Sequence, residues 1–203
     1  MNTIQLHNVG KRFNNDWIFK SLDYTFTWGN HYVIIGKNGS GKSTLLQCIA
    51  GFTNPSKGTI EFTNCSSDLI YKMVSIAAPY LELIEEMTAA EQIHFHKKFK
   101  GLRNHIDTNT ILEKTGLKGT ANKEIRNFSS GMKQRLKLGL AFFSDCPILL
   151  LDEPCSNLDK EGQQIYLDLV EEVKQEKLII VASNDPIEYQ FCQHQIDIMQ
   201  YKS

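Results

Sequence analysis

The stretch Gly36-Lys37-Asn38-Gly39-Ser40-Gly41-Lys42-Ser43-Thr44 decides the fold of this chain. It matches the pattern G-x-x-x-x-G-K-[ST], in which a glycine-rich loop holds phosphate groups. The apolar, β-branched run 32–35 before it is typical of a buried parallel strand. The segment 45–51 after it suits a helix that ends at a glycine. This order of strand, loop and helix favours a phosphate-binding loop over a glycine-rich turn that binds nothing.

The residue types of the loop fit a bound triphosphate. Glycines let the backbone bend tightly and leave no Cβ between its N–H groups and the phosphates. Lys42 can bring a positive charge to the β- and γ-phosphates, and the Ser43 hydroxyl is a hard oxygen ligand for Mg²⁺. The candidate binding residues of the loop are Gly36, Asn38, Gly39, Ser40, Gly41, Lys42, Ser43 and Thr44.

Length and composition indicate an ordinary globular protein. The 203 residues are 41% hydrophobic and 22% charged, which predicts one domain or a domain with a subdomain. The net charge of −1 gives no reason to expect a nucleic acid or an anionic membrane surface as partner. Five scattered cysteines, including Cys65, indicate reduced thiols in a cytosolic protein. The sequence predicts no signal peptide and no bilayer-spanning run, so we expect another chain to provide any membrane part.

Strand-like and helix-like segments alternate and predict an α/β fold with a mostly parallel sheet. Two alternating segments separated by the turn signal at 14–16 predict a small N-terminal antiparallel β unit. From about 81 to 124 the composition indicates a helical subdomain, inserted into a core of about 1–80 and 125–203, and we expect a single domain over 1–203. The predicted strands are 3–9, 22–28, 59–62, 73–77, 148–151, 178–182 and 195–199, and the later helices are 129–144, 160–175 and a turn after Pro186.

Two carboxylates, Asp152 and Glu153, directly follow a predicted buried strand. Ligands of open α/β sheets bind at the carboxyl ends of the strands. At that edge Asp152 can hold Mg²⁺ through water, and Glu153 can accept a proton from water that attacks the γ-phosphate. Capping of the following turn is the alternative role, because acidic residues often follow strands.

Small residues open the predicted helix 129–144, at Phe128-Ser129-Ser130-Gly131-Met132. A helix N-terminus with small side chains can meet an anion, because its N–H groups are free and its dipole end is positive. A simple serine N-cap is the alternative. The combination with the glycine loop and the two carboxylates favours the anion site.

Together these motifs resemble the nucleotide-binding subunit of an ATP-binding cassette (ABC) transporter over essentially the whole chain. Residues 36–44 resemble the Walker A motif, and residues 148–153 resemble Walker B with its catalytic glutamate. Residues 128–132 resemble the family signature, usually written L-S-G-G-Q. Residues 155–159 resemble the D-loop with Asp159 at its acidic position, and Phe13 stands where the family places an aromatic that stacks on adenine.

The resemblance implies a P-loop NTPase core and an ATPase that works as a dimer. Two copies of this chain, or one copy and a homologous cassette, would enclose two ATP molecules with Mg²⁺. Hydrolysis would open the dimer, and a separate transmembrane subunit would receive the movement at the cytoplasmic face of the cell membrane. Residues Lys42, Ser43, Asp152 and Glu153 of one subunit would face Ser129, Ser130, Gly131 and Met132 of the other.

Two departures from the family pattern concern hydrolysis. Pro79 stands where the family has the Q-loop glutamine, and proline has no side-chain amide; Gln92 lies too far along to replace it. Asn184 stands where the family has the switch histidine, and it can donate a hydrogen bond but cannot carry a proton. With Lys42 and Glu153 retained as catalytic residues, we expect ATP binding and closure with slow hydrolysis.

Some alternatives stay open from the sequence. The chain could be a soluble ABC-type ATPase switch, or an ATP-binding regulatory module with little turnover, although the short helical insertion favours transport. The resemblance implies that Tyr80, Leu81, Ile84 and Met87 help to form a groove for the membrane subunit, but a core-facing segment fits them equally well. His94 and His96 point to different helix faces, which predicts a solvated surface rather than a metal site.

Overall fold

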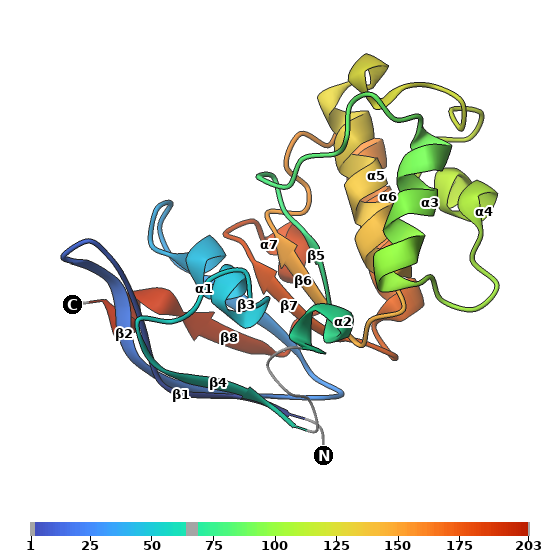
Figure 1. Ribbon diagram of the computed structural model, residues 1–203. Helices are drawn as coiled ribbons and strands as arrows, with labels where there is room; N and C mark the ends of the chain where they lie inside the picture. The colour runs from blue at the N-terminus through green and yellow to red at the C-terminus, as the bar shows by residue number, and fades with distance from the viewer. Residues whose placement is uncertain (1–2, 64–68, 203) are drawn as a thin grey trace.

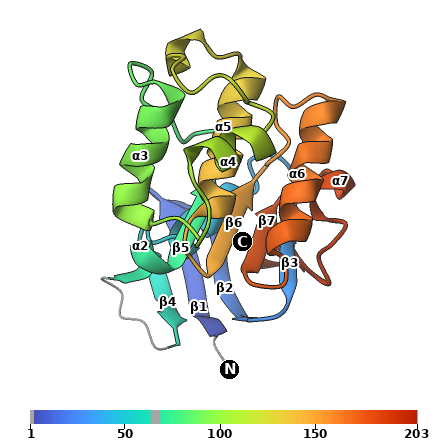
Figure 2. The same ribbon diagram turned by 90° about the vertical axis from the view of Figure 1, so that its right-hand side faces the viewer.

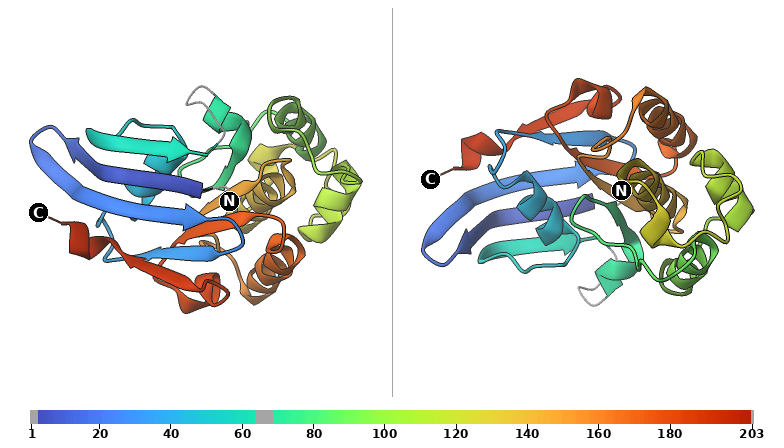
Figure 3. Two further views of the ribbon diagram at one scale, coloured as in Figure 1. Left: turned by 90° about the horizontal axis from the view of Figure 1, so that it is seen from below. Right: turned by 90° about the horizontal axis from the view of Figure 1, so that it is seen from above.

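A computed structural model describes residues 3–63 and 69–202 (Figure 1). Cys65 lies outside the described residues, as do the two ends of the expected domain 1–203. Two β-sheets form the framework, and helices occupy the space between them and the far side of the larger sheet (Figures 1 and 3).

The smaller sheet is antiparallel and contains three strands in the order β2-β1-β4. Strands β1 (Thr3–Phe13) and β2 (Asp16–Thr27) form a hairpin, as the turn signal predicts. The third strand, β4 (Lys57–Phe62), pairs with the other edge of β1, with Leu6 opposite Ile60. The sequence predicts β4 as a strand but not its place in the sheet, because this pairing joins segments that are far apart in the sequence, such as Leu6 and Ile60.

The larger sheet contains five strands in the order β5-β6-β7-β3-β8, and each pairing is parallel. This confirms the predicted α/β fold with a mostly parallel sheet and an N-terminal antiparallel unit. Successive side chains of β6 point to opposite faces. Leu149 and Leu151 enter one hydrophobic core, while Ile148 and Leu150 enter the other. The strands are β3 (His31–Ile35), β5 (Val74–Ala77), β6 (Ile148–Asp152), β7 (Leu178–Ala182) and β8 (His194–Asp197).

Helix α1 (Lys42–Ile49) fills the space between the two sheets, where Leu45 and Leu46 are fully buried. Helices α3 (Ala89–Lys100), α4 (Thr108–Lys114), α5 (Ser130–Phe143) and α6 (Lys160–Val173) lie together on the other side of the larger sheet (Figure 2). The remaining helices are α2 (Ile70–Met73) and α7 (Pro186–Tyr189), with 3₁₀ turns at Ile125–Asn127 and Ile198–Tyr201.

Several predicted boundaries are wrong. β1 continues four residues beyond the predicted end at 9, and β2 begins six residues before the predicted start at 22, while most other ends differ by one or two residues. Met73 ends α2 instead of starting a strand, and the last strand stops at Asp197. Among the described helices, none is long and apolar enough to cross a membrane.

The predicted solvated surface at the two histidines is correct for His94 and wrong for His96. His94 is exposed, whereas His96 is partly buried with its Nε2 2.8 Å from the Ser144 hydroxyl. Burial, together with the positive charge of Lys100, lowers the pKa of His96 to about 4. A second ammonium group, that of Lys177, donates to the Ser144 carbonyl nearby.

We therefore expect acid to destabilise the fold through His96. An unfolded histidine has a pKa near 6.5, so between pH 6.5 and 4 the unfolded chain binds the proton and the folded chain does not. Stability should fall by about 1–3 kcal/mol as the pH drops through this window. Urea unfolding at several pH values measures it. His96→Gln should flatten the dependence, whereas the exposed control His94→Gln should leave it intact. An unchanged slope in His96→Gln would contradict this account.

Candidate phosphate-binding site

The glycine loop connects β3 to α1, and its backbone explains its sequence. Gly39 and Gly41 have φ angles of 73° and 105°, which favour glycine. A Cβ at Gly41 would lie 2.3 Å from Cγ2 of Ile18, so β2 packs directly against the loop. The loop thus adopts the tight turn that brings backbone N–H groups to the start of a helix, where anions bind.

Two polar side chains of the loop are buried. Lys42 is 5% exposed, and its Nζ donates to the Gly36 carbonyl at 2.8 Å. Ser40 is 3% exposed, and its Oγ has no hydrogen-bond partner among the described residues. A buried hydroxyl without a partner is costly. Both groups therefore fit a site that an anion completes.

Asp152 and Glu153 reach the loop from the carboxyl end of β6. Asp152 is 2% exposed, and its Oδ1 lacks a hydrogen-bond partner within the described part of the chain. Burial raises the pKa of Asp152, and a hydrogen bond from Ser43 opposes that rise. The Ser43 hydroxyl and the Asp152 carboxylate are neighbouring hard oxygen ligands, and the Oδ1 without a partner leaves an electron pair for a cation. This donor set fits Mg²⁺.

Glu153 is held in an uncommon conformation. Its φ is 42°, in the left-handed region, and its N–H donates to the Ala182 carbonyl at 3.0 Å. The side chain is exposed, in contrast to that of Asp152. Because left-handed backbone at a non-glycine residue costs free energy, such positions are often functional.

Asn184 comes to the loop from the segment after β7. Its Oδ1 accepts from the Gly36 N–H at 3.2 Å, and its Nδ2 donates to the Asn38 Oδ1 at 3.3 Å. Asn38, Glu153 and Asn184 line one cleft of about 230 Å³. The fold therefore gathers the loop, the two carboxylates and Asn184 at one edge of the sheet.

Ser129–Met132 does not join this group. Ser129 caps α5 and accepts from the Met132 N–H at 3.2 Å. Figure 1 shows α5 and α1 on opposite sides of the larger sheet. A Cβ at Gly131 would lie 3.1 Å from the Asn157 carbonyl, so this helix start lies beside the segment 155–159. Asp159 caps α6 by accepting from the Gly162 N–H at 2.8 Å.

Phe13 ends β1 on the hairpin whose other strand contacts the loop through Ile18. Its ring is 52% exposed, and the Lys11 ammonium lies 5.3 Å from the ring centroid. The ring is thus available for stacking.

Tyr80, next to Pro79, lies near the carboxylates rather than in the groove predicted for a membrane subunit. The carbonyls of Ala78 and Pro79 accept from Lys137 Nζ, each at 3.3 Å. Burial and the Asp152 carboxylate raise the pKa of Tyr80 to about 12, while a hydrogen bond with Gln47 opposes the rise. Tyr80 therefore lies toward α1 and the carboxylates. Gln92 does not replace the missing glutamine, because its side-chain Oε1 accepts from the Ile84 N–H at 3.0 Å.

Comparison with known proteins decides the family. The family model described as "ABC transporter" matches residues 19–156, which contain the glycine loop, Ser129–Met132 and both carboxylates. The chain belongs to the ABC transporter family.

The ABC relatives cover most of the chain. The energy-coupling factor transporter ATP-binding protein EcfA1 of Thermotoga maritima is 34% identical over 92% of this chain and 74% of its own. The ABC transporter ATP-binding protein YybJ of Bacillus subtilis is 31% identical, covering 89% of this chain and 85% of its own. The cytochrome c biogenesis ATP-binding export protein CcmA of Brucella abortus is 30% identical, covering 91% and 86%.

Solved ABC structures share the fold at lower identity. An ABC transporter ATP-binding protein of Pyrococcus furiosus superposes with a TM-score of 0.84 at 18% identity, over 99% of this chain and 100% of its own. The dimeric ATP-binding cassette MJ0796, in a post-hydrolysis state with ADP and Pi, has a TM-score of 0.82 at 22% identity and covers 96% and 94%. These likenesses confirm the P-loop α/β fold.

Proposed function

We propose that this ABC protein is the ATP-binding and ATP-hydrolysing subunit of a membrane transporter. The observation that carries the proposal is the convergence of Lys42, the Ser43–Asp152 pair and Glu153 at one sheet edge. The names of its relatives, which are transporter ATP-binding proteins, support it. We propose one domain over 1–203, in which residues 81–124 form a helical subdomain inserted into a core of about 1–80 and 125–203.

Each residue of the site has a proposed task. When ATP binds, the Lys42 ammonium gives up its hydrogen bond to the Gly36 carbonyl and donates to the β- and γ-phosphates instead. The loop N–H groups and the Ser40 hydroxyl bind the same phosphates. Ser43 and Asp152 hold Mg²⁺, which supplies positive charge to the phosphates when bound. The Glu153 carboxylate accepts the proton of the attacking water, and the Phe13 ring stacks on adenine.

The exposed start of α5 is the reason for proposing a dimer. Ser129 and Ser130 are exposed, and this helix start lies away from the loop of its own chain. In our proposal it binds the ATP held by a second copy or a homologous cassette, with residues 155–159 at the junction. The cassette MJ0796, which shares the fold and is dimeric in its solved structures, supports this arrangement.

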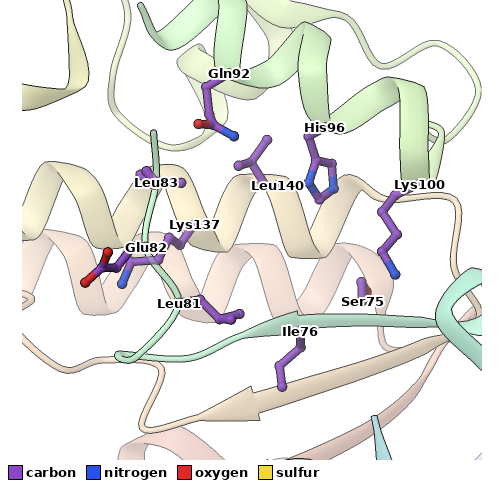
Figure 4. A pocket seen from close by; sticks show the side chains of 10 residues that line it. All are labelled: Ser75, Ile76, Leu81, Glu82, Leu83, Gln92, His96, Lys100, Lys137 and Leu140. Atoms are coloured by element: carbon purple, nitrogen blue, oxygen red, sulfur yellow. The ribbon is translucent and has the colours of Figure 1, made fainter. Parts of the chain in front are cut away.

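A pocket between β5, α3 and α5 supports docking of a separate transmembrane subunit at the cytoplasmic face of the membrane. The pocket has a volume of about 230 Å³, and Leu81 and Leu83 line it together with polar side chains of α3 and α5 (Figure 4). Ile84, next to Leu83 in the chain, is 38% exposed, whereas Tyr80 lies toward α1 and Asp152 and does not line the pocket. Met87 instead packs against the core, so only part of the predicted groove segment is available to a partner.

Phosphate release by the purified chain tests the enzymatic part. We expect steady-state release from MgATP, and tight binding of a fluorescent ATP analogue. Absence of both would overturn the proposed function. Binding without release would reduce it to an ATP-binding regulatory module.

We further propose that Asn184 makes hydrolysis slow. Its amide can donate to the γ-phosphate, but it cannot become a cation as histidine can. We expect Asn184→His to raise turnover several-fold and Asn184→Ala to lower it by about 10-fold, less than the full loss of a transition-state donor. Steady-state phosphate release at saturating ATP measures both. Asn122→Ala, at an exposed asparagine in the segment between α4 and α5, is the control. Turnover that neither Asn184 variant changes would contradict the assignment.

A further inference from the structure

Glu188 is a buried carboxylate that the proposed mechanism does not use. It lies on α7, is only 4% exposed, and lines the same cleft as Glu153 and Asn184. Its Oε1 accepts from the Cys155 N–H at 2.6 Å. Its Oε2 has no hydrogen-bond partner among residues 3–63 and 69–202. A carboxyl group is rarely buried in this way without a reason in its surroundings.

The Cys155 hydrogen bond joins two segments that approach the cleft from different strands. Cys155 follows Glu153 at the end of β6, and Glu188 follows Asn184 after β7. The bond therefore connects the backbone two residues after Glu153 with the Glu188 side chain of α7, the helix that begins two residues after Asn184. A second contact anchors the same turn from α5, since Gln134 Nε2 donates to the Pro154 carbonyl at 2.8 Å.

The charges around Glu188 indicate that its carboxylate does more than fill space in the core. Burial raises its pKa, and the carboxylates of Asp185 and Glu153 raise it further. The Ser183 side chain and the Cys155 N–H oppose this rise. From α6, the Tyr166 hydroxyl donates to the backbone carbonyl of Glu188 at 2.6 Å. In the segment after β6, burial raises the pKa of the Cys155 thiol to about 12 and so keeps it neutral. An apolar side chain would avoid the repulsion but would leave the Cys155 N–H unpaired.

We propose that Glu188 is a positioning residue, which holds Glu153 and Asn184 in a fixed relation across the γ-phosphate side of the cleft. This inference rests on the proposed ATPase function. The Oε1–Cys155 bond sets the backbone after Glu153, while the α7 backbone sets the segment that carries Asn184. Loss of the bond should misplace the proton acceptor without removing the loop contacts that bind nucleotide.

Two substitutions and a matched control test the proposal. Glu188→Gln keeps an acceptor for the Cys155 N–H, whereas Glu188→Ala removes it. We expect kcat of Glu188→Ala to fall by about 10–100-fold with KM for MgATP within about 3-fold, because misplacement by about 1 Å can cost this much. Glu188→Gln should stay within about 3-fold of wild type. Tyr166→Phe removes the hydrogen bond from α6 to the Glu188 backbone carbonyl but keeps the Glu188 carboxylate. This variant should retain most of the wild-type kcat.

Amide hydrogen exchange provides a readout that needs no turnover. In Glu188→Ala, exchange should accelerate at 153–158 and 183–185 together, while the loop 36–44 stays protected as in wild type. Equal exchange in Glu188→Ala and wild type would overturn the proposal, as would a kcat loss matched by Tyr166→Phe. A wild-type chain without turnover would defeat the proposed hydrolysis, yet the exchange result would still decide whether Glu188 links the two segments.

Discussion

Lys42→Met should weaken ATP binding by about 100-fold and abolish measurable turnover. Lys42 is the buried cation of the loop, and its ammonium already sits on a loop carbonyl at 2.8 Å. A hydrogen bond between charged groups contributes about 1.5–3 kcal/mol, which corresponds to roughly a 10–150-fold change in Kd. Methionine keeps the length and apolar stem of the side chain, so the loss reports the charge. Equilibrium titration with a fluorescent ATP analogue measures it.

Lys37→Met is the control for Lys42→Met. Lys37 lies in the same loop and carries the same charge, but its side chain is exposed. Its affinity for ATP should stay within about 3-fold of wild type, because an exposed charge is screened by water and salt. If Lys42→Met binds as tightly as the control, the loop is not the phosphate site.

Glu153→Gln should lower hydrolysis by about 10²–10³-fold and leave ATP affinity nearly unchanged. A positioned general base typically contributes 10²–10⁴-fold, and glutamine cannot accept the proton. The amide keeps the size of the side chain at a residue with a φ of 42°, so the local backbone should persist. With hydrolysis blocked, the ATP-bound state should accumulate as a dimer of about twice the 23.2 kDa monomer mass. Size-exclusion chromatography with light scattering, with and without MgATP, measures it.

Glu171→Gln makes the same chemical change outside the site, on an exposed part of α6. It should hydrolyse ATP as wild type does and show no stable dimer. A Glu153→Gln protein that remains monomeric with MgATP would speak against the dimer proposal. Full hydrolysis by Glu153→Gln would remove Glu153 as the base.

Local motifs explain why much of the site could be predicted. The glycine loop, its strand and its helix lie within residues 31–49, so their contacts depend on neighbours in sequence. The position of Asp152 follows from a short apolar run that ends in a carboxylate. The burial of both faces of β6 follows from its run of four apolar residues, which is typical of a parallel strand covered on both sides.

Contacts between distant segments explain what could not be predicted. No local pattern indicates that Glu188 would accept from Cys155, or that Tyr80 would lie toward Asp152. His96 was expected on a solvated surface because His94 and His96 point to different helix faces, yet packing against the end of α5 partly buries it. These outcomes depend on how helices and strands from separate parts of the chain pack.

By itself, the sequence determined that a phosphate-binding loop and two carboxylates belong to an α/β protein of the ABC type, because loop, strand end and helix start each carry a local signature. Only the tertiary structure decided which of these groups meet in one chain. The parallel order of β6, β7 and β3 brings the loop, Asp152, Glu153 and Asn184 to one edge. The same sheet separates them from Ser129–Met132 on α5, because the two helices α1 and α5 pack on its opposite faces.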